Sequence, residues 1–439
     1  MSKIVTRIAP SPTGKFHIGG LRTALYNYFF ARQNEGVFIV RSEDTDKERS
    51  KKEFEENMLE ALAWLGLEHD AFYRQSDRTD IYIEHINKLI LSGHAYEAEE
   101  SSGDEGGKVI RFKNPNIDVT FHDLILGDIT FNTEELGDFV IARNMNSPLY
   151  HLTVVIDDGL SEVSHVIRGQ DHISNTARQI LILEALGFTR PLYAHIPLIL
   201  SEGGGKMSKR DPSVYPVTEY REMGILPDAL INFMAMIGWN PGDEREIFTK
   251  EELVQAFSLD KVQKKGSVYN IQKLFWINKE HLKKLSDGEL DIYFKKFLPQ
   301  EISEELYLKI RTLLVERVSY GKEIVDMYQA GEFSYYIENP KITDLSKIIW
   351  KQSTLEDAKK HLSHVLELCN KAEDSDFETE ESVKNLVWDY AEEVGKGDVL
   401  WPLRYTLTGQ DKSPNPFFVA SVIGKEKTIQ RIQSVLESL

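Results

Sequence analysis

The sequence predicts an α/β protein: a Rossmann-like parallel sheet that is split by a mixed α+β insert and followed by an all-α C-terminal region. Three observations support this prediction. Strand and helix patterns alternate over the first ninety residues, they alternate again after residue 150, and helical periodicity dominates from about residue 286. Strands that alternate with helices imply a parallel sheet.

The first ninety residues contain two strand–helix repeats. The β-rich run Ile4–Ile8 leads into Ala9–Gly14, whose prolines stop any helix. Apolar residues then recur at helical spacing over 21–29, and the short apolar run Val37–Arg41 is typical of a buried parallel strand. A second helix is expected over 54–65. The first strand therefore ends at a loop that opens a helix, which is where such sheets bind ligands.

The alternation is interrupted between residues 94 and 149. The composition of Ser101–Gly107 is that of a flexible polar loop. Three short runs resemble strands of an inserted subdomain: Val109–Phe112, Asp128–Phe131 and Phe139–Arg143. The α/β pattern then resumes with a strand at Val163–Ile167, a helix at Asn175–Leu186 and a strand at Leu192–Leu200.

These patterns divide the chain into five segments. Residues 1–93 and 150–211 are expected to form the two halves of the sheet domain, and the insert occupies 94–149. Residues 212–285 are expected to be mostly helical, and Pro227 is well placed as the first residue of a helix. Residues 286–439 are expected to form a second helical region, with an internal boundary near residue 350.

Composition excludes several classes of protein. No apolar run approaches the roughly 20 residues that a membrane helix needs, and no signal peptide is visible, so we expect a cytoplasmic protein. The single cysteine, Cys369, cannot form a multi-cysteine zinc site and is expected to fill space on a helix. The formal net charge of −18 argues against nonspecific adhesion to nucleic acid. An RNA partner nevertheless needs only a local positive surface.

The first chemically informative motif is His17-Ile18-Gly19-Gly20, directly after the proline-rich loop. A helix that begins near His17 presents free backbone N–H groups and the positive end of its dipole, which suit a phosphate. Gly19 and Gly20 leave no side chain between backbone and ligand. His17 can donate a hydrogen bond to a phosphate as charge develops. Taken alone, a histidine at a helix start is more often a cap or a core residue.

The second motif is Lys206-Met207-Ser208-Lys209-Arg210, preceded by three glycines. Basic side chains on a glycine-hinged loop suit a mobile clamp on pyrophosphate oxygens. A short basic cluster is more often a solvated surface loop, but its pairing with the first motif at this distance favours the clamp.

The third motif is Ile167–His172, at the end of a predicted strand and the start of a helix. Arg168 would there be a buried cation that awaits an anion. A structural ion pair is an equally good interpretation of Arg168 taken alone.

Together the motifs resemble those of the class I aminoacyl-tRNA synthetases. The first matches the HIGH signature of that class, and the second matches the KMSKS signature. Further segments resemble the glutamyl branch, in the order of the family: Thr6–Gly14, Arg41–Asp46, Tyr150–Leu152 with Asp157-Asp158, Ile167–His172, and Pro402–Gly409 near the end. The resemblance covers nearly the whole chain.

Three features depart from the family pattern. Gly20 stands where the HIGH signature has its second histidine, and Gln170 stands where the family commonly has glutamate. The insert at 94–149 is short for the family's acceptor-stem-binding subdomain. The zinc-binding cysteines of some relatives are absent, so we expect no zinc and no other protein-bound metal site.

The resemblance implies a two-step reaction. Glutamate attacks ATP to give glutamyl adenylate, and the 3′-terminal adenosine of tRNA-Glu then takes the glutamyl group. ATP implies Mg²⁺ bridging its phosphates. In this family glutamate activation is expected to require bound tRNA, and the family analogy favours a monomer.

The resemblance also implies residue roles, with His17, Lys206 and Lys209 as the catalytic residues. The expected ATP contacts are His17, Gly19, Gly20, Asp171, His172, Ile199, Lys206, Met207, Ser208 and Lys209. The expected glutamate contacts are Arg7 on the γ-carboxylate, Arg168 and Tyr150 in support, Glu43 on the α-ammonium, and Ala9 and Ser11. Arg404 is the expected tRNA contact in the anticodon-binding region.

Four alternatives are kept open. A truncated relative attaches glutamate to a modified base of tRNA-Asp, but it lacks the C-terminal half. A glutaminyl enzyme should have a β-barrel-like anticodon half, which residues 286–439 do not indicate. A small-molecule nucleotidyltransferase would not need the Lys206–Arg210 loop together with a long helical region. A catalytically inactive paralog that only binds tRNA would fail to catalyse ATP–pyrophosphate exchange.

Overall fold

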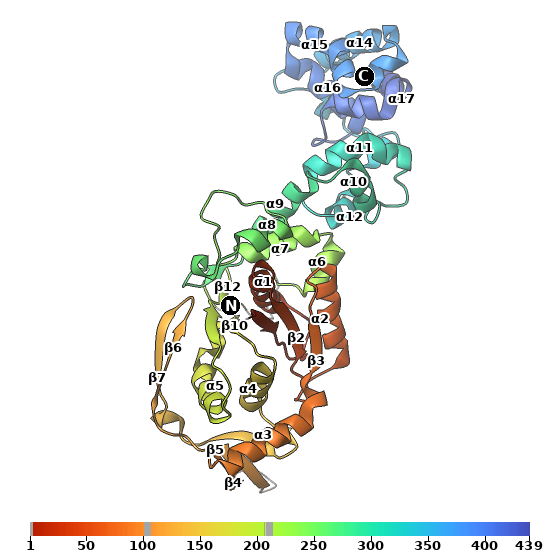
Figure 1. Cartoon of the computed structure of the whole chain (residues 1–439). Coiled ribbons are helices and arrows are strands. Elements are labelled where there is room, and N and C mark those ends of the chain that lie inside the picture. Colours follow the sequence, from red (N-terminus) through yellow and green to blue (C-terminus); the bar gives the residue numbers. More distant parts are fainter. Residues whose placement is uncertain (1–2, 101–106, 206, 208–213) are drawn as a thin grey trace. The chain divides into compact units, whose positions relative to one another are not determined.

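The computed structural model describes residues 3–100, 107–205, 207 and 214–439 (Figure 1). The predicted loop at Ser101–Gly107 therefore lies almost entirely outside the described residues. Contacts divide the chain into two units, Met1–Lys284 and Leu285–Leu439.

The first unit is built on parallel strands, as predicted. Its first half holds β1 (Val5–Ile8), β2 (Val37–Ser42) and β3 (Ala71–Arg74), which pair in that order and in parallel. The connecting helices are α1 (Ile18–Gln33), α2 (Lys52–Trp64) and, after β3, α3 (Thr79–Leu91). All four residues of β1 are buried, which explains its run of β-branched and apolar side chains.

The second half adds β10 (His165–Gly169) and β11 (Leu192–Ile196), also parallel, with α4 (Tyr150–Leu160) and α5 (Ile173–Ala185). The halves join between β1 and β10, where the backbone N–H of Ser164 donates to the Val5 carbonyl at 3.0 Å. The carboxyl ends of β1, β10 and β11 therefore lie at one edge of the sheet domain.

The insert is less separate than the sequence suggested. Its strands β4 (Ala95–Glu100), β5 (Gly107–Phe112), β8 (Phe139–Asn144) and β9 (Ser147–Pro148) form an antiparallel sheet of their own. The hairpin of β6 (Asp118–Asp123) and β7 (Gly127–Asn132) instead joins the edge of β11, with Tyr193 opposite Asp123 (Figure 1). Three of these strands, β5, β7 and β8, were predicted, whereas β4, β6 and β9 were not.

The predicted strand Leu192–Leu200 is wrong in its length. It breaks at Pro197, which cannot donate to a sheet, and its last residues form β12 (Ile199–Leu200). That strand pairs with β13 (Ser267–Val268) instead. The remaining helices of this unit are α6 (Val217–Met223), α7 (Pro227–Met236), α8 (Lys250–Ala256) and α9 (Ile271–Leu282). Pro227 is the first residue of α7, as predicted.

The second unit is helical, and all of its residues are described. It contains α10 (Asp287–Phe294), α11 (Glu304–Arg317), α12 (Lys322–Gln329), α13 (Ser334–Ile337), α14 (Leu355–Lys371), α15 (Glu380–Val394), α16 (Lys396–Thr408) and α17 (Pro416–Ser438). No strand occurs in residues 285–439, so the β-barrel expected of a glutaminyl enzyme is absent from this unit. Cys369 is buried in α14, and burial raises the pKa of its thiol to about 11, as befits a space-filling residue. Among the described residues of both units, no helix has the length and apolar character to cross a bilayer.

Candidate active site

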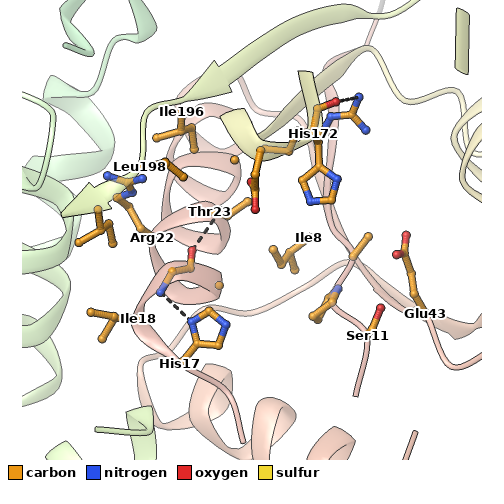
Figure 2. Close-up of a pocket in the computed structure, with 18 of the residues that line it drawn as sticks. Ile8, Ser11, His17, Ile18, Arg22, Thr23, Glu43, His172, Ile196 and Leu198 are labelled. Atoms are coloured by element: carbon orange, nitrogen blue, oxygen red, sulfur yellow. Dashed lines mark hydrogen bonds between the residues drawn. The ribbon is translucent and has the colours of Figure 1, made fainter. Parts of the chain in front are cut away.

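A pocket of about 430 Å³ lies at the carboxyl ends of β1, β10 and β11. Figure 2 shows His17, Ser11, Glu43 and His172 around it. All described residues that the sequence assigned to ATP or glutamate line this one pocket: Arg7, Ala9, Ser11, His17, Gly19, Gly20, Glu43, Tyr150, Arg168, Asp171, His172, Ile199 and Met207. Lys206, Ser208 and Lys209 lie outside the described residues.

One end of the pocket is formed by the start of α1. His17 is the N-cap of this helix, and its Nδ1 accepts a hydrogen bond from the backbone N–H of Gly19 at 3.1 Å (Figure 2). The two interpretations of His17, helix cap and pocket residue, therefore both hold. The structure also explains the missing second histidine, because a Cβ at Gly20 would lie 2.7 Å from the buried ring of Phe16.

The other end of the pocket is a buried network of charged side chains. Arg7 on β1 donates from Nε and Nη2 to the carboxylate of Asp158 on α4, at 3.1–3.2 Å. Arg41 on β2 is fully buried and donates to Asp158 at 2.6 Å and to Glu43 at 3.1 Å. Arg41 and Asp158 thus join Arg7 to Glu43, the two groups predicted to bind opposite charges of glutamate.

The network sets the charge state of its two carboxyl groups. Burial raises the pKa of Asp158, whereas the neighbouring charges of Arg7 and Arg41 lower it. The combined effect of the two arginines is larger, so the net shift is downward and the carboxylate stays ionised. Burial raises the pKa of Glu43, and the charge of Arg41 opposes this only in part. The hydrogen bond from Arg41 is the only one that the side chain of Glu43 makes with described residues.

Arg168, at the end of β10, is a buried cation whose described partners are neutral. Its Nε donates to Nε2 of His195 at 3.3 Å, and its Nη2 donates to the hydroxyl of Thr176 at 2.8 Å. No described carboxylate forms a salt bridge with Arg168. The structure therefore favours the cation that awaits an anion over the structural ion pair.

The charges at this end of the pocket do not cancel. Three arginines (Arg7, Arg41 and Arg168) face two carboxylates (Glu43 and Asp158), which leaves one surplus positive charge. The next residue, Asp157, pairs with Arg78 at 2.7 Å and with Nε of Arg41 at 3.9 Å. Asp157 and Arg78 together add one charge of each sign, so the surplus is unchanged. A ligand with a net charge of −1 would therefore neutralise the site.

His172 lies beside Tyr150 in the pocket. Its Nδ1 lies 3.1 Å from the hydroxyl of Tyr150 and 3.2 Å from the amide of Asn175. Burial, together with the charge of Arg168, lowers the pKa of His172 to about 4. The imidazole is therefore neutral near pH 7 and adds no charge to the site.

Sequence reasoning missed Arg41 and Asp158 as functional residues, although it quoted both within family-like segments. Their signal was a charged residue inside an otherwise apolar run, because such a residue is buried only with a partner. It also missed Arg22, which is a buried charged residue of the same kind. Other missed pocket residues carry no such signal: Thr13, Thr23, Val154, Leu198 and Val214.

Metal-binding groups are sparse in the described part of the chain. Glu43 and Asp171 are the described carboxylates that line the pocket. Among described residues, no cluster of three or more His, Cys, Asp or Glu side chains could hold a metal ion.

In the helical unit, Arg404 lies at a partly exposed aromatic cluster. Its guanidinium lies over the ring of Trp401 at 4.5 Å, and Trp401 packs against Trp350 with ring centres 5.3 Å apart. Two other aromatic residues of the helical unit, Tyr405 and Phe417, are buried core residues.

Comparisons with known proteins agree with this geometry. Residues 3–104 and 97–276 match the family model of class I tRNA synthetases (E and Q), catalytic domain, and residues 280–436 match an anticodon binding domain. A glutamate–tRNA ligase of Aquifex aeolicus is 41% identical, with 100% of each chain covered. One of Desulforamulus reducens is 37% identical, over 99% of this chain and 100% of the relative.

A solved structure is similar over the same length. The crystal structure of a glutamate tRNA ligase from Elizabethkingia meningosepticum, in complex with its amino acid, has a TM-score of 0.88 and 34% identity, and 100% of each chain is covered. The matches span both units, including the helical unit that a truncated relative would lack. The chain therefore belongs to the class I glutamate–tRNA ligases, the ATP-dependent enzymes that attach glutamate to tRNA.

Proposed function

We propose that this pocket binds ATP and glutamate together, with the residue roles that the family resemblance implies. The observation that carries the proposal is that all described residues assigned to the two substrates line one pocket. Its two ends also differ as the two substrates do, because one is a helix start and the other is a charged network.

The helix-start end suits the phosphates of ATP. The backbone N–H of Gly20 and the ring of His17 stabilise the negative charge that develops there. The N–H of Gly19 already donates to His17, and Gly19 contributes by leaving space for the phosphates. Lys206 and Lys209, supported by Met207 and Ser208, neutralise the departing pyrophosphate. Asp171, His172 and the backbone at Ile199 contact the adenosine.

Mg²⁺ is expected to accompany the ATP. A hard cation of this kind binds phosphate oxygens, water and one or two carboxylates. With Glu43 assigned to the α-ammonium of glutamate, Asp171 is the other described carboxylate that lines the pocket. The phosphates and water are therefore expected to supply most of the ligands.

The charged end suits glutamate. Asp158 occupies Nε and Nη2 of Arg7, so Nη1 is the part of the fork that is left for the γ-carboxylate. Arg168, supported by Tyr150, adds a second cation, and Glu43 takes the α-ammonium, with Ser11 and the backbone of Ala9 beside the substrate. Glutamate, with a net charge of −1, neutralises the surplus positive charge, whereas uncharged glutamine does not.

The reaction then needs positioning more than a nucleophilic side chain. An oxygen of the α-carboxylate attacks the α-phosphorus of ATP, and the bond to the bridging oxygen breaks as pyrophosphate leaves. The 2′-hydroxyl of the terminal tRNA adenosine next attacks the glutamyl carbonyl, and AMP leaves.

The proposal extends to the partner and the setting of the enzyme. We assign tRNA-Glu as its tRNA, with Arg404 beside Trp401 as an anticodon contact, since unpaired bases are recognised by stacking and edge hydrogen bonds. The enzyme is proposed to work as a monomer in the cytoplasm.

The deciding experiment is ATP–pyrophosphate exchange with and without tRNA-Glu, using glutamate, glutamine and aspartate in turn. We expect exchange only when glutamate and tRNA-Glu are both present. Exchange with glutamate alone would contradict the tRNA-dependent mode, and exchange with glutamine would contradict the assigned charge selectivity.

Replacing Lys209 with alanine is expected to slow adenylate formation while leaving the fold intact. Loss of one preorganised charge on a leaving group typically slows chemistry by about 100- to 1,000-fold. Single-turnover formation of glutamyl adenylate and the thermal midpoint of unfolding measure the two effects. Wild-type exchange in this variant would remove Lys209 from the clamp, and Lys264→Ala, outside the motif, serves as the matched control.

A further inference from the structure

The side chains behind Arg168 form a chain of hydrogen bonds that the substrate contacts do not explain. Arg168 and His195 are paired residues on the neighbouring strands β10 and β11. Nε of Arg168 donates to Nε2 of His195 at 3.3 Å, and Nδ1 of His195 lies 2.7 Å from Oδ2 of Asp123. The side chains of His195 and Asp123 are both fully buried. A buried polar chain of this kind holds its members in one arrangement.

The partners of His195 determine where its proton lies. An ionised carboxylate can only accept, so Nδ1 carries the proton and donates to Asp123. Nε2 is then left as the acceptor for Arg168 and for the hydroxyl of Thr176, which lies 3.2 Å away. Burial lowers the pKa of His195 and outweighs the opposing hydrogen bond to Asp123, so the ring is neutral. If the ring were protonated, the N–H at Nε2 would face the N–H at Nε of Arg168, and no hydrogen bond could form between them.

Asp123 is itself fixed by backbone groups. Its Oδ1 accepts from the backbone N–H of Ile125 at 3.0 Å and of Leu126 at 2.9 Å, both in the turn of the β6–β7 hairpin. Its Oδ2 also accepts from the backbone N–H of His195 at 3.0 Å. These hydrogen bonds fix the orientation of the Asp123 carboxylate, and the carboxylate in turn fixes the orientation of the His195 ring through the contact with Nδ1.

We propose that Asp123 and His195 are positioning residues, which hold the guanidinium of Arg168 in the orientation that meets the substrate carboxylate. His195 takes Nε and Thr176 takes Nη2. Nη1 makes no hydrogen bond to a described residue and is the nitrogen presented to glutamate. The insert thus contributes to glutamate binding through Asp123, although Asp123 does not line the pocket. This inference rests on the proposed role of Arg168.

The two amide replacements of His195 separate positioning from a purely structural role. In His195→Asn the amide takes the place of Nδ1, so the contact with Asp123 is kept and the acceptor for Arg168 is lost. In His195→Gln the amide takes the place of Nε2, so an acceptor for Arg168 is restored and the donor to Asp123 is lost. A positioning role predicts that glutamine rescues glutamate binding, whereas a structural bridge to the insert predicts that asparagine does.

The measurement is the KM for glutamate and the KM for ATP in tRNA charging by the full-length variants. We expect His195→Asn to raise the KM for glutamate about tenfold or more, the size expected when a hydrogen bond to a charged group is lost. The KM for ATP should stay unchanged, and His195→Gln should lie closer to wild type. Asp128→Asn is the matched control, because it alters an exposed His–Asp pair on the same hairpin, where Asp128 lies 2.6 Å from His122.

Two outcomes overturn the proposal. One is a glutamate KM for His195→Gln that equals or exceeds that of His195→Asn, and the other is an equal rise in the KM for ATP. Arg168→Leu distinguishes the possible failures. If it leaves the glutamate KM unchanged, the role of Arg168 fails and this inference fails with it. If it raises that KM while the two His195 variants do not differ, only the inference fails.

Discussion

Replacing Asp158 with asparagine is expected to lower the free energy of unfolding by about 3–5 kcal/mol, the cost of removing one partner from a buried ion pair. Arg7 and Arg41 both donate to this carboxylate, so the N–H₂ group of asparagine would face one of them. Arg41 is fully buried and would keep Glu43 as its nearest acceptor. Urea unfolding followed by circular dichroism measures the loss.

The same substitution should change how stability depends on pH. Because the folded-state pKa of Asp158 lies below its usual value, the stability that it contributes is present above the unfolded pKa of about 4 and is lost as pH falls through the folded value. The variant should lose that contribution. The exposed pair of Asp46 and Arg49 provides the control Asp46→Asn. An Asp158→Asn protein as stable as wild type would show that the network does not hold this part of the fold together.

The parallel sheet was predictable because its strands and helices are local patterns. Val37–Val40 is apolar throughout, and Pro227 marks a helix start by its own geometry. The attachment of the β6–β7 hairpin to β11 could not be predicted, because it depends on contacts of Asp123 with Tyr193 and His195, which lie far along the chain. No local pattern records such a pairing.

In the site, too, some residues could be predicted from local sequence patterns and others depend on contacts between distant parts of the chain. Residues with a family motif, such as His17 and Arg168, could be assigned from the sequence. Their supporting partners could not, because Arg41 and Asp158 are 117 positions apart and meet only once β2 and α4 are packed together. The clash of a Gly20 side chain with Phe16 likewise depends on the three-dimensional turn before α1. Motifs predict the groups that are proposed to meet the substrate, whereas packing shows which groups hold them in place.

Replacing Arg7 with leucine is expected to reduce kcat/KM for glutamate by about 30- to several-thousand-fold, since loss of a buried, hydrogen-bonded charge pair costs about 2–5 kcal/mol. The KM for ATP should change little, because the phosphates are proposed to bind at the other end of the pocket. Arg7→Lys should lie between leucine and wild type, since it keeps the charge but loses the fork that grips Asp158 and the substrate together. Steady-state charging at varied glutamate and varied ATP gives all of these values.

Assays of the Arg7→Leu variant with glutamine in place of glutamate also test selectivity. Wild-type rejection of glutamine is attributed to the surplus positive charge and to an arginine fork that an amide cannot satisfy. If the γ-carboxylate meets Arg7, the leucine variant should lose activity with glutamate and should discriminate less against glutamine. Equal losses for both amino acids would mean that Arg7 shapes the pocket without reading the substrate charge. An unchanged KM for glutamate would move the carboxylate to Arg168 alone, which would then be the only remaining cation at this end without an acidic partner in the described chain.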